Sequence, residues 1–435
     1  MSASAWAQDE SGSEAAQQPQ SEYGGPAILS RGGAPSVFRQ GDQAVLTPFI
    51  AVTAVDQQGE GYSDYGNGVS GMFGVTGTHT WEHSVLDLDY RGTYQYYSRN
   101  AFYRGFDNSL TLGFSHQLTS RLGISLNEDV ARLRNAGSLP LGNLYSSGAA
   151  GYNPLYNALT TNSVLDTPTE ASVTSARLVY QYSTRLSVSV GGTYIVSRQQ
   201  AQETLGADGY NASADVAYRL SRYQTISFNF GFTHFSYVGQ SERMDMPGAG
   251  LGYSVRIGRY WEFALSGGAS RVDSRRESTV ELDPELAQLL GESVIFEKMH
   301  NIVYAPYGSV RLTRSFRHSS WSAGYDRTVV AGNGLYSGSK FETADSGYTY
   351  SGLRRLSLQI GAGYWGYSAL TQSLGRYRSY GASGGFTCRL GKGFSTVGRI
   401  DGRRFYVSDS SLDRTTYIAT LGISWNPGKV PLALW

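Results

Sequence analysis

The sequence predicts an all-β fold: a transmembrane, antiparallel, up-and-down β-barrel of about eighteen strands, with about sixteen as the alternative. Three observations predict it. Apolar and polar side chains alternate along many segments, most of these segments are long enough to cross a bilayer, and short connections alternate with long ones. Tilted strands of about nine to eleven residues span a hydrocarbon core, so the pattern favours a membrane barrel over a soluble sandwich.

The N-terminal residues indicate the compartment. "SASAWAQDE" places Ala5 and Ala7 around Trp6, the A-x-A shape that precedes signal cleavage, so residues 1–7 are interpreted as the end of a signal peptide. Residues 8–42 are rich in Gln, Ser, Glu, Gly and Pro and are too polar to build a core. They are expected to form a flexible periplasmic arm, and residues 43–435 the barrel.

The segment "SVLDLDYRGTYQYYS", Ser84 to Ser98, shows the alternation most clearly. Leu86, Leu88 and Tyr90 fall on one side of a strand, and Asp87 and Asp89 fall on the other, because side chains alternate between the two faces. Aromatic residues gather toward one end of the segment, as they do at a membrane interface. One face is therefore predicted to contact lipid and the other a polar interior.

Similar segments follow to the end of the chain. The stretch "YNASADVAYRL" repeats the alternation, "TISFNFGFTHF" follows it with four phenylalanines, and the last segment ends at Trp425. Short turns such as Gly258-Arg259 and Gly391-Lys392 separate them, each followed one strand later by a longer loop. The predicted strands are 43–55, 68–79, 84–97, 108–119, 121–134, 171–183, 185–197, 209–220, 223–235, 247–257, 260–270, 301–313, 319–329, 346–353, 355–366, 378–390, 393–404 and 414–425.

Composition excludes several other classes of protein. The chain of 435 residues has a net charge of +1, which argues against nucleic acid as a partner, since nucleic-acid binding needs a basic stripe. It has no apolar run of about eighteen residues, so no helical membrane span is predicted. The single Cys388 cannot form an internal disulfide. A β-propeller would show a repeat of about forty residues, which is not found.

After the arm, nearly the whole chain resembles bacterial outer-membrane β-barrels of the porin class. These have an even strand number, short periplasmic turns, long outer loops and aromatic girdles. The resemblance implies a place in the cell outer membrane, with outer-membrane lipid, lipopolysaccharide and the barrel assembly machinery as partners. It also implies an aromatic C-terminal residue, here Trp435. Because Pro427 and Pro431 interrupt the segment before it, either Trp425 or Trp435 is left to close the barrel.

Two segments match enzyme motifs in sequence but lack the structural context that these motifs require. The chain is therefore not expected to be an enzyme or to hold a cofactor. "GAGYWG", from Gly361, fits a dinucleotide fingerprint, and "GASGG", with Ser383, fits a nucleophile elbow. Both lie inside alternating segments and lack the turn into a helix that either site requires. His79 and His83 have no further ligands nearby, so no metal site is predicted.

Alternation assigns acidic, basic and amide side chains to the lumen. Such charges either pair and hydrate inside a polar channel, or form a filter that orients dipolar solutes. The candidates are Asp87, Asp89, Arg91, Asp215, Arg219, Asn229, Glu262, Arg311, Gln359, Arg389, Arg399, Asp401 and Arg403.

The longest connection, residues 135–170, is the third outer loop by strand count. In the porins that the chain resembles, the third loop folds inward and narrows the channel. Its many apolar residues need a wall to pack against, and Tyr145, Tyr152 and Tyr156 are the candidates for a constriction. The open alternative is a loop that lies over its neighbours on the outer surface, since such packing also buries apolar residues. Asp283 to Glu292 is expected to form a short helix in another long loop.

These features predict an outer-membrane channel for small hydrophilic solutes. Two alternatives stay open. A conduit for exopolysaccharide would use aromatic residues for weak stacking, with Tyr97, Tyr260, Tyr307, Trp365 and Tyr367 as candidates. A surface structural or binding barrel would act through its outer loops instead.

Overall fold

The computed structural model describes residues 43–59, 66–98, 104–133, 169–199, 206–238, 242–281, 294–332, 337–370, 376–408, 413–428 and 430–432. The expected signal-peptide end, the arm over 8–42 and the short helix over 283–292 lie outside these residues. So does the third outer loop, apart from the two residues at its C-terminal end. Within the described ranges, no helix is long and apolar enough to cross a membrane.

All eighteen predicted strands are present, and a short nineteenth follows them. They are β1 (Gln43–Gly59), β2 (Asn67–Thr80), β3 (Ser84–Tyr97), β4 (Gly105–Thr119), β5 (Leu122–Leu133), β6 (Thr169–Gln181), β7 (Leu186–Gln199), β8 (Ala207–Arg219), β9 (Gln224–Tyr237), β10 (Glu242–Ile257), β11 (Trp261–Glu281), β12 (Val294–Ser315), β13 (Ser319–Gly332), β14 (Ser337–Tyr350), β15 (Leu356–Ala369), β16 (Tyr377–Gly391), β17 (Phe394–Val407), β18 (Asp413–Trp425) and β19 (Val430–Leu432).

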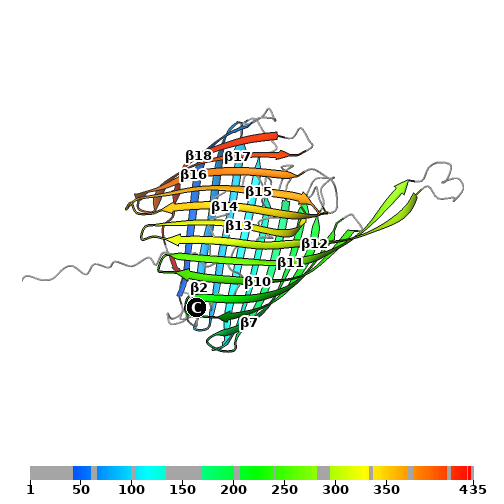
Figure 1. The fold of residues 1–435 in the computed structure, drawn as a ribbon. Helices are drawn as coiled ribbons and strands as arrows, with labels where there is room; N and C mark the ends of the chain where they lie inside the picture. Colours follow the sequence, from blue (N-terminus) through cyan, green and yellow to red (C-terminus); the bar gives the residue numbers. More distant parts are fainter. Residues whose placement is uncertain are drawn as a thin grey trace, which may run out of the picture.

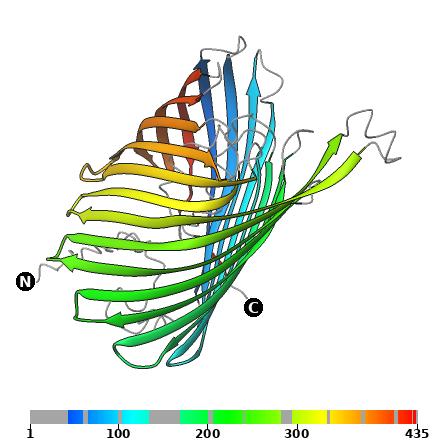
Figure 2. The same cartoon turned by 45° about the vertical axis from the view of Figure 1, so that its right-hand side comes forward.

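The sheet closes on itself. Each strand from β1 to β17 pairs antiparallel with the next, and β18 pairs with β1 from Ile50↔Trp425 to Gly59↔Thr416. The alternative of sixteen strands is therefore wrong. β19 continues along the free part of β1, with Ala44 opposite Leu432. Of the two tryptophans left open above, Trp425 ends the strand that closes the barrel. The strands of the near wall cross those of the far wall at a steep angle, which shows how strongly they tilt (Figures 1 and 2).

One end of the barrel has short turns, and hydroxyl groups stabilise several of them. Between β4 and β5, the Thr119 Oγ1 accepts hydrogen bonds from the backbone N–H groups of Arg121 and Leu122, at 3.2 and 3.0 Å. Ser183 does the same between β6 and β7. In the turn between β16 and β17, Lys392 has a φ of 51°, a rare conformation for a residue with a side chain. The opposite end is called the loop end below, because its connections are longer.

Several strands extend further toward the loop end than predicted. β11 and β12 form a hairpin that projects well beyond the rim (Figures 1 and 2). The prediction that the fourteenth strand spans 346–353 is wrong, since β14 starts at Ser337. The added part of β14 carries Lys340 and Glu342, which broke the expected apolar alternation. Backbone pairing with β13 and β15 holds it in the sheet without such a pattern.

One face of the closed sheet is an apolar belt. Leu178, Val190, Ala214 and Phe230 follow one another across β6–β9 as register partners, and partners share a face of the sheet. The three larger side chains are 41%, 55% and 52% exposed. So large an exposed apolar surface is stable only against lipid, so the belt is the outer face. The chain is an outer-membrane β-barrel of porin-class architecture.

Candidate functional site: the polar inner face

The inner face is formed by the strand positions between the belt residues. On β9, Thr225 and Ser227 alternate with the exposed Ile226 and Phe228. The same alternation on the other strands puts every lumen candidate predicted from the sequence on this face, and their contacts give the geometry of the candidate site.

Four of the predicted charged groups form two ion pairs, each within a single strand. On β3, the Arg91 guanidinium donates to Asp89 at 2.7 Å, while the Thr78 hydroxyl of β2 donates to Asp87 at 2.8 Å. On β17, Arg399 donates to Asp401 at 2.6 Å. Residues two apart in a strand share a face, so these pairs follow directly from the alternation.

Other contacts join side chains from different strands. Arg177 of β6 lies 3.3 Å from Asp215 of β8, which also accepts a hydrogen bond from Ser189 of β7 at 3.2 Å. The Tyr307 hydroxyl of β12 donates to Asn229 of β9 at 2.9 Å. These contacts fix the orientation of polar side chains that would otherwise be mobile in water.

Arg311 of β12 stands between two carboxylates that sequence reasoning missed. Its guanidinium lies 3.8 Å from Asp326 of β13 and 3.8 Å from Asp345 of β14. Asp345 fell outside the strand predicted over 346–353. The sequence did not reveal this part of the strand, because Lys340 and Glu342 interrupt the apolar alternation there.

The remaining candidates are more widely spread. Glu262 accepts two hydrogen bonds from Arg256 near the short-turn end, at 3.0 and 2.6 Å. The Arg403 guanidinium lies over the Trp365 ring, 5.4 Å from its centroid. Three others, Arg219, Gln359 and Arg389, occupy inner-face positions on β8, β15 and β16.

Charges of one sign gather on particular strands. The inner face of β3–β5 carries four acids, and that of β16–β18 carries four arginines; the neutral inner faces of β1 and β2 separate the two groups. The acids are Asp87, Asp89, Asp107 and Asp129, and the arginines are Arg389, Arg399, Arg403 and Arg414. The two groups include one charge of opposite sign each, Arg91 and Asp401, so their excess is partly neutralised.

Toward the loop end the inner face changes from polar to apolar. Buried apolar residues occupy it on strand after strand, and their exposure is 5% or less, so other atoms cover them. Phe341, Tyr367 and Tyr377 form a row, with ring centroids 4.6 and 5.8 Å apart. The buried set comprises Tyr97, Leu133, Val173, Ile195, Phe235, Met244, Val272, Ala305, Val330, Phe341, Tyr367 and Tyr377.

The two segments that match enzyme motifs in sequence are both β-strands. Gly361 to Gly366 lies within β15, and the "GASGG" segment lies within β16; the two pair with each other without interruption. The rings of His79 and Trp81 are tilted against each other with centroids 4.0 Å apart, and His83 lies 3.9 Å from Glu82. No group of three or more His, Cys, Asp or Glu side chains that could hold a metal ion occurs in the part of the chain that the structure describes.

No protein-family model matches the chain, and no curated protein matches it. Solved structures give weak similarity over most of its length. Pseudomonas aeruginosa OccK2 (OpdF) has a TM-score of 0.46 at 11% identity, covering 89% of this chain and 99% of that one. Acinetobacter baumannii OccAB4 has a TM-score of 0.43 at 9% identity, covering 90% and 99%. These scores are low, so no property of those proteins is transferred to this chain.

Proposed function

We propose that the chain is an outer-membrane channel through which small hydrophilic solutes pass along the polar inner face. The closed ring of eighteen strands carries this proposal. Side chains fill the interior of a barrel of about eight strands, but a barrel of about sixteen to eighteen strands leaves an aqueous channel. The inner face is charged and hydroxylated over much of its height, as passage of hydrated solutes requires.

The distribution of charge supports selection by orientation more than by net charge. Most inner carboxylates described above lie beside a guanidinium group, so much of the inner charge is balanced locally. The acidic face of β3–β5 and the basic face of β16–β18 nevertheless differ in sign. A dipolar or weakly charged solute passing between them would be favoured in one orientation.

The segment 135–170 is proposed to narrow this channel. It connects Leu133 and Thr169, which both lie at the loop end, next to the apolar part of the inner face. That face is buried, and the segment supplies apolar side chains suited to cover it, among them Tyr145, Tyr152 and Tyr156. Because the segment contains no Lys or Arg, such a constriction would select mainly by size.

Export of a polysaccharide fits the inner face less well. Of its candidate stacking residues, Tyr97, Trp365 and Tyr367 are at most 8% exposed and offer no free ring face. Tyr260 lies in the turn before β11, and Tyr307 uses its hydroxyl to bond Asn229. The described residues thus lack the continuous row of accessible rings that repeated stacking would need.

Swelling of proteoliposomes tests both proposals. The purified wild-type protein is expected to admit neutral and zwitterionic solutes with rates that fall as solute size rises. Deletion of residues 142–162 should leave the barrel folded, as judged by heat-modifiable gel migration, and should raise the size limit.

Two results would count against these proposals. Wild-type vesicles that swell no faster than protein-free vesicles would refute the channel. A folded deletion variant with the wild-type size limit would refute only the narrowing by this segment.

A further inference from the structure

A band of ion pairs lies on the outer face, immediately beyond the apolar belt on the loop side. Arg132 and Glu170 are 3.2 Å apart, and Arg404 and Asp413 are 2.6 Å apart. Each of these bases has one acid. The other members of the band are Arg198 with Asp208, His234 with Asp245, and Arg327 with Glu342. This band marks the level at which lipid head groups meet the protein.

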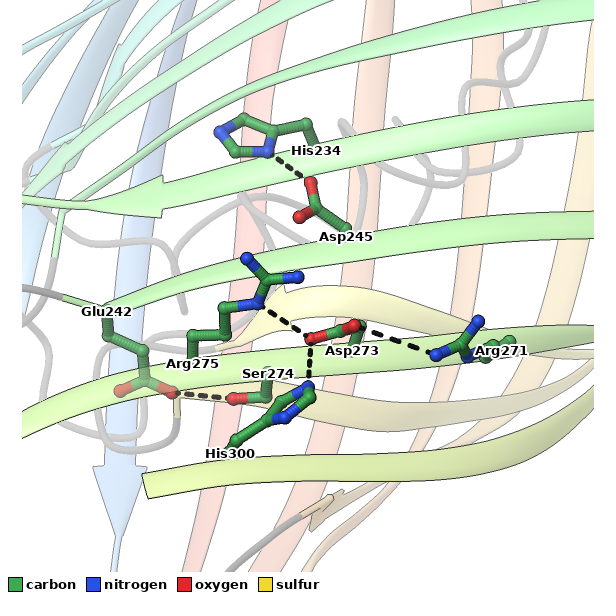
Figure 3. Close-up of polar contacts among 8 residues, drawn as sticks. All are labelled: His234, Glu242, Asp245, Arg271, Asp273, Ser274, Arg275 and His300. Atoms are coloured by element: carbon green, nitrogen blue, oxygen red, sulfur yellow. Dashed lines mark hydrogen bonds and ion pairs between the residues drawn. The ribbon is translucent and has the colours of Figure 1, made fainter. Parts of the chain in front are cut away.

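On β11 and β12, at the base of the projecting hairpin, the basic groups of the band outnumber its acids. There the Asp273 carboxylate accepts from Arg275 at 3.2 Å and contacts His300 at 2.8 Å, with Arg271 at 3.9 Å on its other side. Figure 3 shows these three side chains converging on Asp273, with the His234–Asp245 pair on the adjacent strands. One carboxylate therefore serves three basic groups.

Positive charge is in excess at this place. Arg243 of β10 is exposed and lies opposite Arg275 in the register, and Lys298 lies 3.4 Å from Glu277. Arg243, Arg271, Arg275 and Lys298 are four permanent cations, and Asp273 and Glu277 are two anions, which leaves two positive charges. If Asp245 is added with a neutral His234, one positive charge still remains. Arg271, Arg275 and His300 are each about half exposed.

An exposed apolar surface lies beside the basic cluster, on the neighbouring strand β12. Tyr304 is the register partner of Arg271 and is 73% exposed, and Ile302 is the partner of Asp273 and is 42% exposed. β12 has no β13 partner beside these two residues, because that pairing starts at Gly308. Basic groups and exposed apolar groups side by side, on the outer face at the edge of the belt, match an anionic head group and the start of its acyl chains.

We propose that this surface binds an outer-leaflet lipid with a phosphorylated head group. Arg271, Arg275 and Arg243 would hold the phosphate, since guanidinium groups bind phosphate in bidentate geometry. Tyr304 and Ile302 would pack against the first part of an acyl chain. Elsewhere in the band, Arg132, Arg198, Arg327 and Arg404 each lie beside one acid. Arg378 is a single guanidinium group and donates to the Tyr406 hydroxyl.

Lipid retention by the full chain tests the proposal. The detergent-purified protein is titrated with lipid A that carries both phosphates, and with the same lipid A after enzymatic removal of them, and bound lipid is counted by native mass spectrometry. The double variant Arg271→Gln/Arg275→Gln should retain the phosphorylated lipid about thirtyfold less well, from about fivefold for each basic residue near a charged surface. The control Arg198→Gln/Arg404→Gln removes two arginines from matched pairs and should retain it as the wild type does.

Separate outcomes identify the head group and the acyl contact. Tyr304→Ser should weaken retention of both lipids, and heat-modifiable migration shows that each variant is folded. Equal retention of phosphorylated and dephosphorylated lipid A by the wild type would overturn the proposal, as would an equal loss in the double variant and its control. Displacement of the lipid by millimolar inorganic phosphate would also overturn it, because the site would then take a free anion.

Discussion

Arg403 and Arg404 are adjacent in the sequence and belong to opposite faces of β17. The first lies over the Trp365 ring on the inner face, and the second pairs with Asp413 on the outer face at 2.6 Å. The alternation of a strand explains this difference without any further assumption. Arg403 and Arg404 are therefore a matched pair of positions for testing which face of the barrel ions contact as they cross.

Neutralising inner arginines should make the channel less favourable to anions. Arg399→Gln/Arg403→Gln is expected to lower the anion-to-cation permeability ratio on the order of twofold, since salt at 0.1 M screens each charge beyond about 10 Å. The reversal potential in a KCl gradient measures this ratio. Arg404→Gln is the control and should leave it unchanged. An equal shift in both variants would show that the inner face is wrongly assigned.

At the residue scale, local pairs were more predictable than pairs between strands. The contacts Asp89–Arg91 and Arg399–Asp401 involve residues two apart, so alternation alone places them together. The contact of Arg311 with Asp345 depends on the start of β14 and on the register of three strands, and the sequence shows neither. The charge excess around Asp273 likewise needs the pairing of β10, β11 and β12.

At the scale of elements, the seam between β1 and β18 closes the barrel and is tightly packed. A Cβ atom added to Gly422 would meet the carbonyl oxygen of Val52 and the side chain of Thr53 on the opposing strand, closer than real contacts allow. Gly384, on β16, has open space at the corresponding position. The glycine at the seam therefore permits the close approach of the two strands.

Gly422→Ala should weaken closure of the barrel, and Gly384→Ala should not. The expected loss for Gly422→Ala is about 1–3 kcal/mol of unfolding free energy, the usual cost of forcing extra atoms into a packed site. Urea unfolding of the protein in detergent, followed by gel mobility without heating, measures the loss. Equal stability of the two variants would contradict the pairing of β18 with β1.

The register of β16 can be tested at the single cysteine. Cys388 lies opposite Leu356 and Thr396, on the belt side with Phe386 and Leu390. A membrane-impermeant maleimide should label it slowly in intact outer membranes. In a Cys388→Ala background, Thr387→Cys should react faster, because that position faces the inner side. The reverse order of rates would mean a register shifted by one residue.

The number and order of strands were predictable from the sequence, but their ends were not. Alternation is strong where one face contacts lipid, so every membrane-crossing segment was found. Beyond the belt the outer face carries ionised groups and the inner face becomes apolar, so the expected pattern is lost, as in the added parts of β11, β12 and β14. Pairing with a neighbouring strand keeps these parts extended, and a single sequence does not reveal that pairing.

At the scale of the whole molecule, the chemical character of both faces of the barrel changes along its axis. The outer face changes from an apolar belt to a band of ion pairs, while the inner face changes from polar to buried apolar toward the loop end. The two boundaries lie near the same end of the strands. The polar part of the inner face therefore lies along the belt, and the proposed constriction would lie where the inner face becomes apolar.

Single-channel recording of the purified wild-type protein in a planar bilayer tests the central claim most directly. A water-filled lumen inside one closed barrel predicts discrete, uniform conductance steps that reverse polarity with the applied voltage. Nonelectrolyte polymers small enough to enter should lower the step size, and larger ones should not. Full insertion of folded protein with no conductance steps, in the presence of a control channel that conducts, would contradict the proposed function.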